Sequence, residues 1–500
     1  MKFIIHNNRC FVDGNYAELR WIEDTLTIGT GKRNFRDGRE IRHKFYNHQS
    51  KSFPTGLLSN ILMHPGAPRL NIQLEDKRTK IQLPSEPALL RGYEKREYQE
   101  AALRTMLEKK RGTIRVATNG GKTVLVSRFL KTIEKLHLRT IVFIHNQEIF
   151  EQLYETISKA VKGVVGVVKG NRTDCSNSQV TIAMVLTFSN RLGEHPHVTK
   201  LYDECQVLIA DECHHLQSPT YQGLFMESNA PIRLGFSGTV PDADTYPGWL
   251  VRACTGPILV DVTNKELIDA GVSAKPTVEM HACDSSKIFH KNFYTDCVES
   301  FVALHAPKLP NGQLFRHDGG FVSLWWKVQF FGFYQRRSIE HGMIHNDSRN
   351  RKIVRLVCDD PKHQHLLVTE RVDHGSNLLA LFRELKEDAE FVSGDTPAAE
   401  RDDAITRFRQ GKLRILISST ILDEGVDIDR IETLVLAGVM KSKRALKQRI
   451  GRGLRKKKSG PNILRVVDFM DTGNRYMEKY SKDREEIWLS EGFDVKHVGG

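Results

Sequence analysis

The chain has 500 residues, of which 40% are hydrophobic, and carries a formal net charge of +13 at pH 7. Such a length is too great for one core and predicts a globular protein of roughly two to four domains. The eight cysteines include no C-x-x-C pair, and no uncharged apolar run reaches the ~18 residues that cross a bilayer, so we expect no zinc site, no membrane span and a cytoplasmic location.

Residues 1–88 are predicted to form a small α+β unit that binds DNA. "KFIIHN" and "RCFVDG" are short strand candidates followed by turn residues, and "PTGLLSNILM" favours a short helix. Basic side chains crowd the stretch 31–51, which is either a solvated loop or a surface that contacts DNA: Lys32, Arg33, Arg36, Arg39, Arg42, His43 and Lys44. The positive net charge favours a polyanionic partner, because each Lys or Arg that meets a phosphate releases a counterion. A basic but otherwise ordinary enzyme is the alternative.

From about residue 89 short apolar runs alternate with helical stretches, as in parallel sheets covered by helices on both faces. The first series of runs is "TIRVAT", "RTIVFIH", "QVTIAMV", "CQVLIAD" and "IRLGFSG". The second is "HLLVTE", "AEFVSG", "LRILISS", "ETLVLAG" and "NILRVVD". The pattern predicts two successive α/β domains, 89–272 and 273–475, followed by a C-terminal tail, 476–500.

The stretch "RVATNGGKTVLV", residues 115–126, joins a predicted strand to a predicted helix through a glycine-containing turn. This is the context in which a phosphate-binding loop is credible. Lys122 is expected to reach the β and γ phosphates of a nucleotide and Thr123 to ligate Mg²⁺. The usual first glycine is replaced by Val116 at the strand end, and Asn119 can replace another glycine because it tolerates left-handed backbone geometry.

Two carboxylates follow a second apolar run, in "QVLIADECHH". Asp211 can hold Mg²⁺ while Glu212 orients and deprotonates the attacking water. The third part of the predicted nucleotide site is a basic segment far along the chain, "QRIGRGLR". In it Arg452 and Arg455 are three residues apart and lie on one helical face. These two arginines are either arginine fingers for the γ-phosphate or part of a nucleic-acid-binding helix with no catalytic role.

In motif order, residues 90–470 resemble the superfamily 2 helicases. "REYQEAAL" is similar to the adenine-reading element, "VATNGGKT" to motif I, "IVFIHNQEIFEQ" to motif Ia, "IAMVLTF" to motif Ib, "DECH" to motif II and "FSGT" to motif III. "LLVTERVDHGSNL" and "FVSGDTPAAER" are similar to motif IV and the element after it, "ISSTILDEGVDI" to motif V and "QRIGRGLR" to motif VI. Within the superfamily, "RNFRDGREI", "FPTGLLSNIL" and "EHGMIHNDSRNRKIVRLV" look like the UvsW-type branch-migration helicases of phages, although XPB-like and RecG-like motors share much of the rest.

The resemblance implies two tandem RecA-like domains with parallel sheets and ATP between them. Its catalytic residues would be Lys122, Glu212, Arg452 and Arg455, with Thr123 and Asp211 on Mg²⁺. ATP contacts would also come from Arg96, Gln99, Thr118, Asn119, Gly120, Gly121, Gly425, Asp427 and Gln448. Nucleic-acid contacts would come from Asn146, Thr187, His374, Gly394 and Thr420.

One further segment, "QLFRHDGGFVSLWWKVQFF" (313–331), fits neither series of strands. A strong turn signal at Asp318-Gly319-Gly320 precedes alternating apolar residues, which predicts a β-hairpin inserted in the second domain. Its exposed Trp325 would stack on an unpaired base, or the hairpin is a structural edge whose tryptophans are core.

The expected function is that of an ATP-dependent DNA helicase or translocase. It would move 3′ to 5′, act as a monomer and unwind or branch-migrate forked and four-way junctions in phage recombination, replication or repair. An RNA helicase and a non-catalytic DNA-binding scaffold are the alternatives, since the motor motifs barely separate RNA from DNA.

Overall fold

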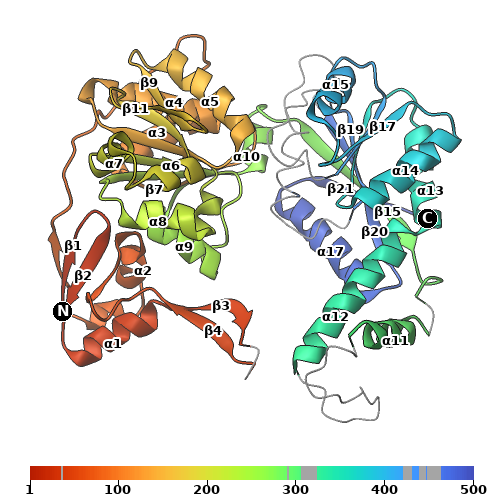
Figure 1. Cartoon of the computed structure of the whole chain (residues 1–500), viewed down its shortest axis with the longest axis horizontal. Helices are drawn as coiled ribbons and strands as arrows, with labels where there is room; N and C mark the ends of the chain where they lie inside the picture. Colours follow the sequence, from red (N-terminus) through yellow and green to blue (C-terminus); the bar gives the residue numbers. More distant parts are fainter. Residues whose placement is uncertain are drawn as a thin grey trace. The chain divides into compact units, whose positions relative to one another are not determined.

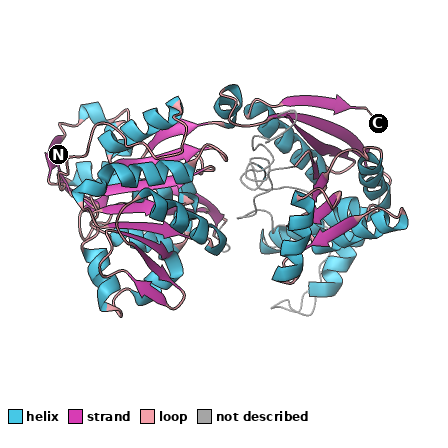
Figure 2. Cartoon of the chain, turned by 90° about the horizontal axis from the view of Figure 1, so that it is seen from above, coloured by secondary structure: helices cyan, strands magenta, loops and turns pink. Residues whose placement is uncertain are grey.

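The computed structural model describes residues 1–34, 38–289, 292–305, 324–419, 431–438, 446 and 463–499. It contains two compact units, Met1–Thr263 and Asn264–Gly500, each built on a largely parallel sheet (Figure 1). Helices flank both sheets (Figure 2). The expected α/β class, with two successive parallel sheets after a small α+β part, is confirmed.

The N-terminal part of the first unit is a four-stranded sheet in the order β5-β2-β1-β6 with a separate two-stranded hairpin, β3–β4. Its strands are β1 Lys2–Ile5, β2 Arg9–Asp13, β3 Thr27–Arg33, β4 Glu40–Lys44, β5 Ser52–Pro54 and β6 Gln73–Asp76. Its helices are α1 Tyr16–Thr25 and α2 Leu58–Leu62. α1 begins at a capping box, in which the Asn15 side chain accepts from the Glu18 backbone N–H and the Glu18 carboxylate accepts from that of Asn15.

This N-terminal part shares one hydrophobic core with helix α9 (Tyr246–Thr255) of the following α/β domain. Leu250 and Ala253 of α9 are buried in the same cluster as Phe3 and Phe53. Contact is close at Gly56, where a Cβ atom would lie 2.0 Å from the backbone oxygen of Arg252. Residues 1–76 therefore pack as part of the first unit.

The main sheet of the first unit has eight described strands in the order β10-β9-β11-β8-β12-β13-β7-β14, all parallel except β10. They are β7 Arg111–Val116, β8 Thr140–Ile144, β9 Val165–Lys169, β10 Arg172–Asp174, β11 Val180–Met184, β12 Val207–Ala210, β13 Ile232–Ser237 and β14 Ile258–Val262. The helices are α3 Glu97–Lys109, α4 Lys122–Ile133, α5 Gln147–Ala160, α6 Val185–Arg191, α7 Pro196–Asp203, α8 Pro219–Glu227 and α9.

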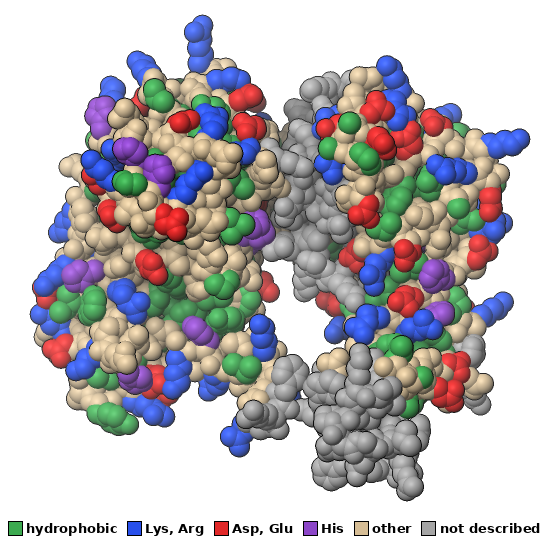
Figure 3. All heavy atoms as spheres, in the orientation of Figure 1, with side chains coloured by type: hydrophobic (Ala, Val, Ile, Leu, Met, Phe, Trp, Pro, Cys, Tyr) green, Lys and Arg blue, Asp and Glu red, His purple; other side chains and the backbone are tan. Residues whose placement is uncertain are grey.

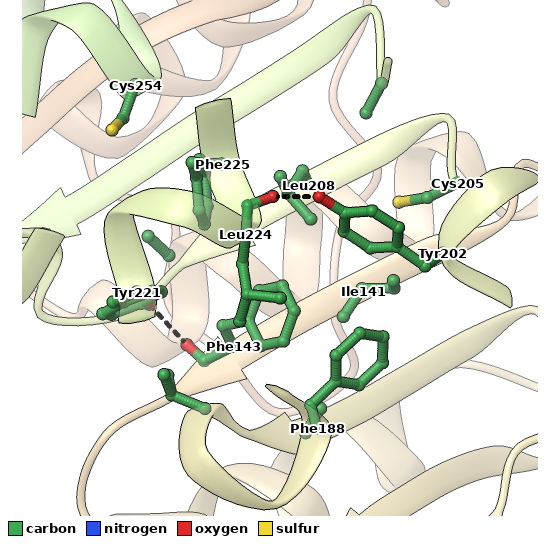
Figure 4. Packing of buried hydrophobic residues seen from close by; sticks show 14 of the residues in the cluster. Ile141, Phe143, Phe188, Tyr202, Cys205, Leu208, Tyr221, Leu224, Phe225 and Cys254 are labelled. Carbon is green, nitrogen blue, oxygen red and sulfur yellow. Dashed lines mark hydrogen bonds between the residues drawn. The ribbon is translucent and has the colours of Figure 1, made fainter. Parts of the chain in front are cut away.

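Aromatic side chains fill the space between this sheet and the helices that follow β11 and β12. Phe143 of β8 is buried against Phe188 of α6 and Tyr221 of α8 (Figure 4). The Tyr221 hydroxyl donates to the backbone oxygens of Phe143, at 3.2 Å, and Asp211, at 3.3 Å. This cluster therefore fixes the position at which the chain leaves β12.

The second unit has seven described strands in the order β17-β18-β16-β19-β20-β15-β21, all parallel. They are β15 Lys275–Asp284, β16 His365–Val368, β17 Ala389–Val392, β18 Ile415–Ser418, β19 Thr433–Leu436, β20 Ile463–Thr472 and β21 Asp494–Val498. The helices are α10 Asn264–Asp269, α11 Phe293–His305, α12 Leu324–Ile339, α13 Asp347–Cys358, α14 Val372–Glu384, α15 Ala398–Arg409 and α17 Arg475–Ser490.

The predicted hairpin at 313–331 is wrong where the structure describes it, because α12 begins at Leu324. Residues 313–323 lie outside the described part, and of Trp325 only the helical backbone is described. A run of adjacent apolar residues fits a period of 2 or 3.6 equally well. Packing against α11 selects the helical period. The ring of Phe301 in α11 contacts Phe330 edge-on and Phe333 at a tilt, and both belong to α12.

The expected C-terminal tail, 476–500, is also wrong. Most of it is α17, whose Trp488 is fully buried, and the rest forms β21 beside β15 at the edge of the sheet. The buried carboxylate of Asp468 accepts hydrogen bonds at 3.0 Å from both Arg484 and the indole N–H of Trp488. These contacts make the C-terminal residues part of the core of the second unit.

Candidate functional site

The phosphate-binding loop predicted at 117–121 leaves the carboxyl end of β7 and enters α4. Val116 is the last residue of the strand and is buried. Asn119 has φ +75° and Gly121 has φ +81°, so both take the left-handed geometry that a tight phosphate-binding turn needs. Lys122 and Thr123 form the first turn of α4, while Thr118 precedes the turn half-buried. The loop therefore presents a helix N-terminus, which favours anions.

The predicted adenine-reading residues hold this loop from the start of α3. Gln99 is buried, and its side-chain amide donates to the backbone oxygen of Gly120 at 3.1 Å. Tyr98 donates its hydroxyl to the same oxygen at 3.0 Å and accepts from Arg96 at 3.2 Å. A Cβ atom on Gly121 would lie 2.6 Å from the Gln99 amide nitrogen and would displace that amide from the loop, while the φ of +81° itself favours glycine. Tyr98, next to Gln99, was not among the predicted site residues.

Two strands bring the loop and the acidic pair together. The order β12-β13-β7 puts the carboxyl end of β12, with Asp211 and Glu212, one strand away from β7. The carboxyl ends of β7, β13 and β12 thus lie along one edge of the parallel sheet, the side on which α/β sheets bind ligands. There the Lys122 ammonium forms an ion pair with the Glu212 carboxylate.

The second oxygen of Glu212 is held by the last residue of β13, Ser237. The Ser237 hydroxyl donates to Glu212 Oε2 at 3.1 Å, and His214 Nδ1 lies 2.8 Å from Ser237 Oγ and 3.2 Å from Glu212 Oε2. The backbone N–H of Thr239 donates to Ser237 Oγ at 3.1 Å. This network connects the predicted motifs II and III through His214, whose role the sequence did not indicate beyond its place after the acidic pair.

Opposed charges set the protonation of this cluster. Burial favours the neutral form of Glu212, but the ammonium of Lys122 and the hydrogen bond from His214 outweigh it, so its pKa lies below the ordinary value. Burial and the neighbouring Glu212 charge raise the pKa of Asp211 to about 6. Burial likewise opposes the charged form of Lys122, yet Glu212 and Asp211 hold its pKa above the ordinary value. Lys122 and Glu212 are thus ionised together.

The donor set at this edge fits a hard cation. The Asp211 carboxylate accepts no hydrogen bond from a described side chain, and Thr239 Oγ1 is buried with no partner among the described residues. Carboxylate and hydroxyl oxygens are the protein ligands that Mg²⁺ prefers. Asp211 and Thr123 are the residues that would hold it. Among the described residues, no group of three or more His, Cys, Asp or Glu is arranged for a metal ion.

The residues expected to contact nucleic acid follow the carboxyl ends of four strands. Asn146 comes after β8 and Thr187 lies in α6 after β11, both half-buried, and Gly394 is exposed after β17. His374, the further residue expected there, lies in α14, where its ring is 1% exposed and its Nε2 lies 2.9 Å from Asn350 Oδ1. Its place on the inner face of α14 explains this burial.

Six expected site residues lie outside the described part of the chain: Thr420, Gly425, Asp427, Gln448, Arg452 and Arg455. In the described part, no helix is both long and apolar enough to cross a membrane.

Two family profiles match this chain. The one described as "Type III restriction enzyme, res subunit" matches residues 92–242, and the one described as "Helicase conserved C-terminal domain" matches residues 348–457. Together they span more than half of the chain and contain both the phosphate-binding loop and the arginine-rich segment.

Curated relatives are similar over most of the chain. The DNA 3'-5' translocase XPB2 of Sulfurisphaera tokodaii is 24% identical over 390 residues, which is 76% of this chain and 83% of the relative. The protein named helicase 22 of the Sulfolobus islandicus filamentous virus is 24% identical over 482 residues, 89% of this chain and 76% of the relative.

Solved structures share the fold at low sequence identity. The helicase domain of Pyrococcus furiosus Hef superposes with a TM-score of 0.51 at 14% identity, covering 78% of this chain and 98% of that one. The crystal structure of T4 UvsW covers 100% of this chain and 99% of that one at 15% identity, with a TM-score of 0.42. The two α/β domains therefore share the RecA-like fold of the Hef domain.

Proposed function

Because this chain belongs to the superfamily 2 helicases, which are ATP-dependent enzymes, we propose that it is a DNA translocase that moves 3′ to 5′. Its substrates would be forked and four-way DNA junctions, which it unwinds or branch-migrates as a monomer. The work would belong to phage recombination, replication or repair in the cytoplasm of a bacterial host. The similarity to a DNA 3'-5' translocase and to a viral helicase supports the polarity and the setting.

The observation that carries the proposal is the ion pair between Lys122 and Glu212 across the carboxyl ends of β7 and β12. A lysine at a helix N-terminus suits phosphate, and an ionised carboxylate beside it suits a general base for water. Both are held in place by partners outside the reaction, since Ser237 and His214 fix Glu212 and Gln99 fixes the loop.

We infer a task for each residue of the predicted site. Arrival of the nucleotide phosphates would draw Lys122 away from Glu212, because the triphosphate offers more negative charge. Glu212, still oriented by Ser237, would then accept a proton from the attacking water, and Arg452 and Arg455 would stabilise the charge that develops. Mg²⁺ bound by Thr123 and Asp211 would supply neutralising charge for the phosphates.

DNA as the polymer is supported by charge. The net charge is +13, and the hairpin β3–β4 carries exposed Lys32, Arg33, Arg39, Arg42 and Lys44. It extends from the N-terminal part in Figure 1, and in Figure 3 further Lys and Arg side chains are spread over the face drawn. Contacts of this kind are independent of sequence, as a translocase requires.

The test is the rate of ATP hydrolysis by the full chain with forked DNA, a four-way junction, single-stranded DNA and single-stranded RNA, each measured over a range of salt. We expect stimulation by DNA, strongest with junctions, and a steep decline with salt. Stronger stimulation by RNA would make the chain an RNA helicase. No turnover with any polymer would make it a binding scaffold.

A further inference from the structure

The second unit contains a pocket of about 230 Å³ at the carboxyl ends of β16 and β19. From β16 the chain continues to β17 on one side of the sheet, and from β19 to β20 on the other. Neighbouring strands whose connections diverge create a crevice at which α/β sheets bind ligands. The pocket therefore lies at a switch point of the second sheet, at the carboxyl ends of its strands.

The floor of the pocket is apolar and has an unusual backbone. It consists of Ile339, Met343 and Ile344, all buried, of which the last two belong to a π-helical turn, Glu340–Ile344, that follows α12 directly. π-helical turns inside helical segments are rare and frequent at functional sites. The flexible, polarizable side chain of Met343 suits a flat aromatic ligand.

The inner wall of the pocket is polar but uncharged. His374 lines it, and burial lowers the pKa of this histidine to about 3. The side-chain amide of Asn350 donates to the backbone oxygen of Ile344 at 3.0 Å, which turns its own oxygen toward His374 Nε2. Nε2 must therefore carry the proton of the neutral ring. An uncharged interior excludes a phosphate group but accommodates a nucleobase.

The rim of the pocket is charged. Arg336 in the last turn of α12 and Arg371 just before α14 are both exposed. Glu370, which follows β16, and Gly438, which follows β19, complete the lining. No ion pair or hydrogen bond of either guanidinium with another described residue is present. Arginines with no partner among the described residues suit phosphate oxygens, and the half-buried carboxylate of Glu370 suits the amino and imino N–H groups of a base.

We propose that this pocket binds one nucleotide unit, with the base on the apolar floor and the flanking phosphates on the Arg336 and Arg371 rim. The volume is below the roughly 300–1,000 Å³ of pockets for larger ligands and suits a single ring system. The nucleotide is a residue of the bound strand, so the inference rests on the proposed function. A free nucleotide has the same chemistry, and the test separates the two sources.

The first measurement follows the Met343 methyl group by NMR in the full chain with ¹³C-methyl-labelled methionine, with the signal assigned by Met343→Leu. Short oligo-dT should shift this signal, and an abasic oligomer of the same length should not. Thymidine monophosphate that shifts it at a comparable concentration would identify a free nucleotide as the source. Equal shifts with the abasic strand, or no shift with any probe although oligo-dT binds, would overturn the proposal.

The second measurement compares affinities. The preference of the wild-type protein for oligo-dT over the abasic strand should fall about tenfold in Ile339→Phe, which fills the pocket, since one stacked base contributes on this order. Unchanged affinity for the abasic strand shows that the variant is folded. An unchanged preference would refute a base in the pocket.

The rim is tested by Arg336→Ala and Arg371→Ala. Each should weaken oligo-dT binding more than its matched control on an exposed arginine, Arg355→Ala in α13 and Arg383→Ala in α14. Equal effects of rim and control variants would remove the phosphate part of the proposal. If oligo-dT did not bind the protein at all, the proposed function itself would fail, which is a different outcome.

Discussion

The substitution Glu212→Gln tests the candidate catalytic network most directly. The amide keeps the shape of the carboxylate and can still accept the hydrogen bond that Ser237 donates to Oε2 at 3.1 Å. Its nitrogen then faces Lys122 in place of Oε1, and an N–H group cannot pair with an ammonium. The variant therefore loses the ion pair and the general base while the surrounding contacts are retained.

The expected loss of turnover is about 100-fold to 10,000-fold, the usual share of a general base. ATP affinity should hold or rise, because Lys122 no longer has to leave Glu212 before it meets phosphate. The folded state should lose about 1.5–3 kcal/mol, the contribution of a hydrogen bond to a charged group. Such a loss leaves the protein folded, so the two effects can be measured on the same sample.

The assay pairs phosphate release in the presence of forked DNA with equilibrium binding of a fluorescent ATP analogue. Glu227→Gln, an exposed position at the end of α8, makes the same chemical change away from the site and serves as the control. A loss of turnover below about tenfold would mean that another residue is the base. A weakened affinity for ATP would refute the idea that the ion pair competes with phosphate.

Further variants address the remaining parts of the chain. Lys122→Ala should abolish ATP hydrolysis and leave DNA binding nearly unchanged in a filter-binding assay, because DNA affinity comes from many spread basic contacts. Arg455→Ala should lower turnover about a thousandfold while ATP still binds, and a loss of DNA affinity alone would show a nucleic-acid-binding helix instead. Arg484→Met should cost about 3–5 kcal/mol in urea denaturation, because it leaves the Asp468 carboxylate buried and unpaired, and a cost under ~1 kcal/mol would contradict that burial. Gly56→Val should destabilise the first unit by at least about 1–3 kcal/mol through its clash with the α9 backbone, whereas an unchanged melting temperature would show that the N-terminal part is not packed there.

Local backbone chemistry made the nucleotide loop predictable. Asn119 was expected to replace a glycine in a left-handed turn, and its φ of +75° agrees. The apolar runs around Val116 and before Asp211 likewise became β7 and β12, because buried parallel strands need continuous apolar sequence. Both inferences depend on neighbours in the chain, which a sequence shows directly.

Features that depend on tertiary packing were not predictable. The alternation around Phe330 indicated a strand, and contact with α11 made it a helix. The burial of the polar His374 ring was not predictable either, because it depends on Asn350 from another helix, which holds the ring inside the second unit. The bridge from His214 through Ser237 to Glu212 joins two segments whose proximity follows only from strand order.

The shared core of the N-terminal part and α9 also bears on how the chain melts. Because Phe3 and Phe53 are buried against Leu250 and Ala253, residues 1–76 lack a complete hydrophobic core without α9. Removing residues 1–88 would expose that face of α9, so the deletion cannot serve as a clean test of DNA recognition. In differential scanning calorimetry, the N-terminal part and the first RecA-like domain should unfold in a single cooperative transition.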